Sequence, residues 1–101
     1  MYNDRDKLRE VSDWMRALAN HDRLPLIAHL AYGQCTPTDL SHKLKLDIVN
    51  ISHSLGELRK VGIVDSKKMG RNQFYFLKDA TVNLKTLILR KHSIELVITL
   101  E

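Results

Sequence analysis

The sequence predicts a mainly α fold of the α+β kind, with five helices and one β-hairpin between the fourth and fifth. Along most of the chain apolar residues recur at spacings of three and four, the pattern of amphipathic helices. Between residues 63 and 77 this period gives way to two short runs around a Gly-Arg turn, which is typical of a hairpin. The 101 residues, 44% of them hydrophobic, favour one folded domain over residues 1–101.

The first two helices are indicated by apolar faces and by the residues between them. We expect the first over residues 6–19. Its apolar face consists of Leu8, Val11, Met15 and Leu18. Asp22 can cap the second helix, in whose first turn Pro25 is tolerated, and Gly33 ends it.

The third and fourth helices lie close together in sequence. The third is short and begins at Thr36 and Pro37, an N-cap followed by proline at the first helical position. The fourth begins at Asp47 and ends at Gly62. Its expected buried stripe is Ile48, Ile51, Leu55, Leu58 and Val61. The tight link between the two helices predicts a helix-turn-helix over residues 37–61.

The rest of the chain completes this arrangement. The hairpin at residues 63–77 would be a wing behind the helix-turn-helix, and Asp79 can cap a fifth helix over about residues 80–97. The apolar positions of that helix would be Leu84, Leu87, Ile88, Ile94 and Ile98. Residues 6–19 and 80–97 carry more apolar surface than a small core requires, so we expect both helices to form a homodimer interface.

The positive charge is concentrated in one segment. The chain has a net charge of +4, and residues 36–78 hold eight Lys and Arg against four acids, whereas the remainder is neutral. Such a segment can face the phosphates of double-stranded DNA, because Lys and Arg displace condensed counterions. The alternative is a solvated basic face without a partner.

The outward face of the fourth helix has small, uncharged polar residues near its N-terminal end. Asn50 could pair with adenine and Val49 could touch a thymine methyl, while Ser52 and His53 could contact bases or phosphates. Gly56 would permit close approach of the third helix or of DNA. The predicted DNA-contacting residues are Thr38, His42, Val49, Asn50, Ser52, His53, Lys60, Lys67, Lys68 and Arg71. The alternative is an ordinary exposed helix followed by a charged turn.

Five blocks of sequence carry a family resemblance. They are residues 16–24 (RALANHDRL), 36–40 (TPTDL), 50–55 (NISHSL), 58–64 (LRKVGIV) and 70–77, with Gly-Arg followed by FYFL. In order and spacing they resemble the ArsR/SmtB family over about residues 14–95. The resemblance implies a winged helix-turn-helix repressor from a prokaryote, which binds a pseudo-palindromic operator as a homodimer and responds to an effector.

Many members of that family respond to metal ions. The positions that resemble the family's Cys-x-Cys pair are Thr36 and Thr38, and the single Cys35 cannot form a thiolate cage. Asp79, His92 and Glu95 resemble three ligands of a second family site, which predicts a weak site for a divalent metal such as zinc as effector. The alternative is that Asp79 is a helix cap and that the other two are surface residues.

Other functions are disfavoured. The sequence lacks a nucleophile–base pair, a Gly-rich phosphate loop and paired carboxylates at useful spacing, so we do not expect an enzyme. No run is apolar enough for a membrane span, and the lone thiol suits a reducing compartment, so we expect a cytoplasmic protein. The remaining rival is a winged-helix protein-interaction module without DNA binding.

Overall fold

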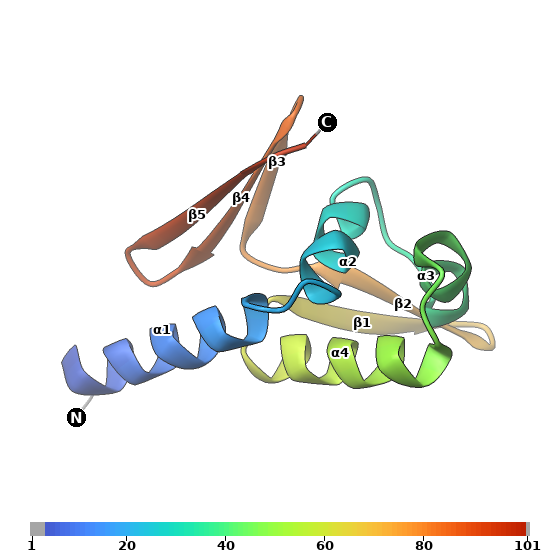
Figure 1. Ribbon diagram of the computed structural model, residues 1–101, viewed down its shortest axis with the longest axis horizontal. Coiled ribbons are helices and arrows are strands. Elements are labelled where there is room, and N and C mark those ends of the chain that lie inside the picture. Colours follow the sequence, from blue (N-terminus) through green and yellow to red (C-terminus); the bar gives the residue numbers. More distant parts are fainter. Residues whose placement is uncertain (1–3, 101) are drawn as a thin grey trace.

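The computed structural model describes residues 4–100, which form four helices and five strands (Figure 1). The helices are α1 (Asp4–Leu18), α2 (Arg23–Leu30), α3 (Pro37–Leu44) and α4 (Ile48–Lys60). The strands are β1 (Val64–Met69), β2 (Asn72–Leu77), β3 (Ala80–Asn83), β4 (Thr86–Lys91) and β5 (Ile94–Thr99). The predicted four-helix portion and the β1–β2 wing are therefore present, in the predicted order.

The core lies where α2, α3 and α4 meet, and the first wing strand packs against α4. Leu26, Leu40, Leu55 and Val64 are completely buried, one from each of these four elements. Burying one such side chain is worth about 1.5–3 kcal/mol, so these contacts set how the two helices of the helix-turn-helix sit on the rest of the domain.

The helix starts agree with the sequence at two of the four predicted caps, Thr36 and Asp47. Thr36 Oγ1 accepts a hydrogen bond from the Asp39 amide at 3.2 Å, as expected for the cap of α3. Asp22 stands at the N-cap position of α2, but its side chain makes no capping bond. Asn20 Oδ1 accepts from the amides of Asp22 and Arg23 instead, at 2.9 and 3.2 Å.

The predicted fifth helix is wrong. Residues 80–99 form a three-stranded antiparallel sheet in the order β3-β4-β5. This sheet lies at the top of Figure 1, apart from the β1–β2 wing. Leu87 and Leu89 of β4 are buried, whereas Ile88 between them is partly exposed and Arg90 after them is exposed. This alternation has the period of two that is typical of a half-buried strand. Leu84, read as part of a helical stripe, is 94% exposed in the β3–β4 turn.

Asp79 likewise precedes a strand and caps no helix, and residues 80–97 cannot supply a dimerisation helix. The segment is rich in Thr, Val and Ile, which favour strands because their branched side chains pack well on a pleated surface. Within the described part of the chain, no helix is both long and apolar enough to cross a membrane.

Candidate nucleic-acid interface

The turn between α3 and α4 is held by local hydrogen bonds. Lys45 adopts the left-handed conformation, with φ at 55°, and ends α3. Ser41 Oγ donates to the Leu46 carbonyl at 2.5 Å, and the Leu46 amide donates to the Ser41 carbonyl at 3.2 Å. Asp47 Oδ1 then accepts from the Val49 amide at 2.9 Å and starts α4. The entry angle of α4 is thus set by bonds on both sides of the turn.

One face of α4 is buried and the opposite face is open. Ile51, Leu55 and Leu58 lie in the core, as predicted, but Ile48 is 42% exposed at the start of the helix. The open face is a stripe at spacings of three and four, which we call the α4 outer stripe. It consists of Val49, His53, Gly56 and Lys60, all exposed, with Ser52 exposed beside it.

Gly56 lies in the middle of this stripe. Among residues 4–100, nothing lies within 4 Å of the position that a Cβ atom would take there. The glycine is therefore not required by packing against α3 or any other described element. A mid-helix glycine costs about 1 kcal/mol relative to alanine, and no intramolecular contact explains that cost.

Asn50 does not belong to the outer stripe. Its Nδ2 donates to Asp22 Oδ2 at 3.2 Å, and its Oδ1 accepts from the hydroxyl of Ser54 at 3.2 Å. Ser54 is only 3% exposed. Both ends of the Asn50 amide thus bind within the chain and connect α4 to the start of α2.

An acidic side chain lies among the cations of α4. One carboxylate oxygen of Glu57 is 3.8 Å from His53 Nε2, and the other is 3.3 Å from Lys60 Nζ. Arg59 Nε is 3.4 Å from Asp65 Oδ1 of β1 and so links α4 to the wing. These pairs are largely solvent-exposed and worth little in stability, so Glu57 does not hold Lys60 firmly against another anion.

The wing is a two-residue hairpin closed by Gly70 and Arg71. Met69 pairs with Asn72, and Gly70 has φ at 64°, the conformation for which glycine is favoured. Arg71 is exposed at the tip. Lys67 and Lys68 are consecutive strand residues, so their side chains leave opposite faces of the hairpin, and only one of them can face the same surface as Arg71.

One structural feature of the wing had no signal in the sequence. Cys35 pairs with Tyr75 as a single-residue β-bridge, with N–O distances of 3.1 and 2.8 Å in the two directions. The bridge connects the start of α3 to β2. A one-residue strand has no periodicity, so only a long-range contact reveals it.

Thr38 and His42, one turn apart and exposed on α3, extend the polar surface next to α4.

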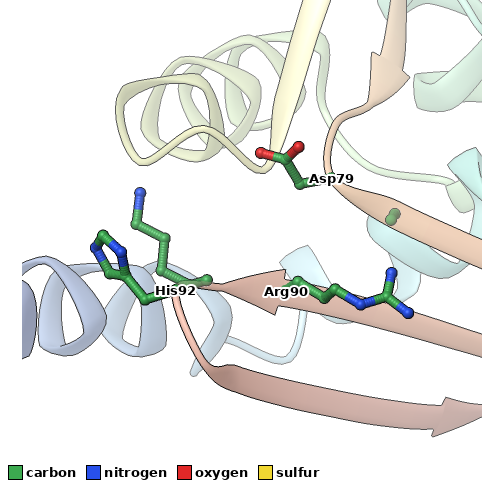
Figure 2. A pocket seen from close by; sticks show the side chains of 5 residues that line it. Asp79, Arg90 and His92 are labelled. Atoms are coloured by element: carbon green, nitrogen blue, oxygen red, sulfur yellow. The ribbon is translucent and has the colours of Figure 1, made fainter.

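The three predicted metal ligands are not brought together. Asp79 and His92 line a hollow of about 460 Å³ with Arg90 and Lys91, and Figure 2 shows the Arg90 side chain pointing away from His92. Glu95 of β5 is not part of that lining, and its carboxylate accepts a hydrogen bond from Arg90 Nε at 2.8 Å.

On the predicted fifth helix His92 and Glu95 would have shared one face, about one turn apart, but His92 lies in the β4–β5 turn and Glu95 lies in β5. Arg90 also donates to Thr81 Oγ1 at 2.6 Å, and both His92 and Lys91 approach Glu10 of α1, at 3.6 and 4.0 Å. Residues 4–100 contain no group of three or more His, Cys, Asp or Glu side chains that could share a cation. Asp79, His92 and Glu95 therefore do not form a zinc site within one described chain.

Comparisons with known proteins agree with this architecture. No protein-family model matches the chain. The chain is 32% identical over 74 residues to a protein of Synechocystis sp. named a transcriptional repressor SmtB homolog, covering 73% of this chain and 56% of that one. It is 36% identical over 70 residues to a biofilm growth-associated repressor of Agrobacterium fabrum, covering 69% and 60%. The chain thus spans less than two thirds of the length of these relatives.

A solved structure shares the fold. The homodimeric winged helix-turn-helix DNA-binding domain Mb0332 of Mycobacterium bovis, described as a possible ArsR-family regulator, superposes with a TM-score of 0.69 at 27% identity, and the match covers 75% of this chain and 72% of that domain. The observed fold and the sequence relationships agree, since the structure contains a core of α2, α3 and α4, a tight turn before α4 and a wing. The chain belongs to the ArsR/SmtB family of winged helix-turn-helix transcriptional regulators.

Proposed function

We propose that this protein is a sequence-specific double-stranded DNA-binding regulator that represses transcription as a homodimer on a pseudo-palindromic operator. The observation that carries the proposal is the α4 outer stripe. It presents small and uncharged side chains at the N-terminal end of a helix whose start is fixed by the helix-turn-helix, next to a wing with Arg71 at its tip. That end of a recognition helix is the part that enters the major groove.

Each exposed residue has a role that fits its chemistry. Val49 is 71% exposed and contacts a thymine methyl group, while Ser52 and His53 form hydrogen bonds to base edges. Thr38 and His42 on α3, Lys60 on α4 and the wing cations contact phosphates. Asn50 supports the helix through Asp22 and Ser54 and does not read a base in this proposal.

Salt dependence tests the phosphate contacts. The affinity of the wild type for a duplex selected from a random pool should fall linearly with the logarithm of salt concentration. Arg71→Ala should weaken binding to all sequences alike and reduce the salt slope by about one. Lys85→Ala removes an equal charge at the exposed β3–β4 turn and is the matched control, for which the slope should stay unchanged.

The same measurements distinguish the proposed function from its rival, a winged-helix module that binds only protein. A winged-helix module that binds only protein would show no duplex binding, or binding that Arg71→Ala and Lys85→Ala weaken equally. Base reading is tested separately: His53→Ala should relax the preference at one position of the selected site, by about 1–3 kcal/mol. A uniform loss at all positions would instead assign His53 to a phosphate.

A further inference from the structure

The first turn of α4 carries two exposed apolar side chains. Ile48 is 42% exposed and Val49 is 71% exposed. A single exposed apolar side chain is common on a protein surface, but these two are adjacent and directly follow the cap residue Asp47. The apolar pattern of α4 predicts that Ile48 is buried. Its exposure therefore adds a second apolar residue to the end of the helix that the proposed function places in the major groove.

The same part of α4 offers few hydrogen-bonding groups to a base. Residues 46–58 contain neither Lys nor Arg, the side chains that most often read guanine. The amide of Asn50, a group suited to adenine, forms its hydrogen bonds within the chain. Ser52 and His53 are the exposed polar residues next to the apolar pair. Apolar contact therefore supplies a large share of base recognition at this end of the helix.

The apolar group that a base edge presents in the major groove is the methyl group at C5 of thymine. The other groups that distinguish the base pairs there are hydrogen-bond donors and acceptors. An Ile or Val side chain placed against those groups removes their water and gives no hydrogen bond in return, which costs free energy. Cytosine methylated at C5 carries its methyl group at the same position as thymine. Apolar side chains on a base edge thus favour 5-methylpyrimidines over unmethylated cytosine.

We propose that Ile48 and Val49 read two neighbouring 5-methylpyrimidines in each half-site, thymine in unmodified DNA and 5-methylcytosine in methylated DNA. The inference rests on the proposed DNA-binding function and names the chemical group that α4 recognises. Consecutive Cα atoms are about 3.8 Å apart and successive bases of one strand about 3.4 Å apart, so two adjacent residues suit two adjacent bases. Ser52 lies between the two side chains on the helix surface, about 40° from Ile48 and about 60° from Val49. Its small side chain leaves space for both methyl groups.

The branched side chains of this pair suit such a contact. Within a helix, Val and Ile are largely restricted to one χ1 rotamer. Their methyl groups therefore have a fixed orientation before DNA binds, and the contact costs little side-chain entropy. The backbone of the turn is fixed as well, because Asp47 Oδ1 accepts a hydrogen bond from the Val49 amide at 2.9 Å. The apolar surface that meets the bases is thus formed in the free protein.

Replacement of single thymines by deoxyuridine tests the contact on the DNA side. The change removes the methyl group and keeps the base pair with its hydrogen-bonding groups. In one half-site of a duplex selected from a random pool, it should weaken wild-type binding about fourfold at each of two adjacent positions and leave it unchanged elsewhere. A C·G pair in place of either T·A pair should also weaken binding. Methylation of that cytosine at C5 should then restore about fourfold.

Alanine substitutions assign each methyl group to a side chain. Val49→Ala should bind thymine and deoxyuridine equally at one of the two positions, and Ile48→Ala should do so at the other. Val97→Ala is the matched control: it makes the same change at a 59% exposed valine of β5 and should keep the full preference for thymine. All three variants should keep the circular dichroism of the wild type, because none of these residues belongs to the core cluster.

The outcomes for the two proposals differ. A wild type that binds no duplex contradicts the proposed function and this inference with it. A wild type that binds a duplex with the expected salt dependence, but is insensitive to deoxyuridine at every thymine, contradicts the inference alone. A preference for thymine that persists in both alanine variants also overturns it, because the methyl group would then act through the shape of the DNA.

Discussion

Asn50 shows how one long-range contact assigns the role of a polar helix residue. On a helical projection it is a neighbour of Val49 and His53, and the sequence predicts that it reads a base. In the folded chain its amide donates to Asp22, which does not use its side chain to cap α2, and it accepts from the buried hydroxyl of Ser54. The residue therefore fixes α4 against the α1–α2 connection.

Substituting this residue should lower stability. Asn50→Ala removes both hydrogen bonds and leaves the Ser54 hydroxyl buried without its acceptor, which should reduce the free energy of unfolding by about 1–2 kcal/mol. The measurement is urea denaturation followed by the fluorescence of Trp14, the single tryptophan, which is 2% exposed. Ser52→Ala, two residues further on and on the exposed side of α4, should change stability by less than about 0.5 kcal/mol.

Gly56 should respond in the opposite direction. Gly56→Ala meets no described atom within 4 Å and improves helix propensity, so the free energy of unfolding should rise by about 1 kcal/mol. If the glycine admits the DNA close to the α4 backbone, affinity for the selected duplex should fall at the same time. Denaturation and duplex titration of the same preparation check both, and a stabilised protein with unchanged affinity would show that DNA does not approach this position.

At the scale of elements, the three hairpins share one geometry. Each closes with a two-residue turn whose first residue has a positive φ: Gly70 at 64°, Leu84 at 51° and His92 at 55°. Turns of this kind favour glycine at that position. Only the wing has it, so the β3–β4 and β4–β5 turns hold side chains in a conformation that costs an L-residue about 1–2 kcal/mol.

The positive φ of Leu84 provides a test that distinguishes the observed sheet from the helix predicted by the apolar pattern. Leu84→Gly should raise the free energy of unfolding by about 0.5–1 kcal/mol, because it relieves the positive φ in the turn. In a helix the same change would lower stability by about 1 kcal/mol. Lys85→Gly, the next residue and without a positive φ, should not stabilise, so thermal denaturation of the pair gives the sign directly.

The C-terminal sheet also contacts α4. Lys91 Nζ at the end of β4 donates to the Val61 carbonyl at 3.4 Å, where α4 ends, and lies 4.0 Å from Glu10 of α1. A cation at a helix C-terminus is favourable because it opposes the helix dipole. These contacts join α1, α4 and the C-terminal sheet at one point.

At the scale of the whole molecule, folding and association should be coupled. If the chain is a homodimer, as proposed, association can cover exposed apolar side chains such as Leu8 and Met15, and the folded state is then stabilised by mass action. The melting temperature should therefore rise with protein concentration over the micromolar range, measured by Trp14 fluorescence. A protein that melts at one temperature at all concentrations would indicate a monomer.

The sequence by itself determined the portion of the chain whose order is local. Thr36 and Asp47 cap helices through bonds within three residues, the α4 stripe follows a helical period, and Gly70 specifies the wing turn. These signals need no knowledge of distant residues, which is why the helix-turn-helix and the wing could be predicted together with the exposed residues Val49, His53 and Arg71.

Only the tertiary structure decided the features that depend on distant partners. Residues 80–99 contain apolar spacings compatible with a helix and with strands, and the pairing of β4 with both neighbours selects the sheet. Asn50 is bound by Asp22, which lies 28 residues earlier in the chain, and Glu95 is bound by Arg90 across the β4–β5 hairpin. Local propensity differs little between such alternatives, so contacts between segments far apart in the chain determine the outcome.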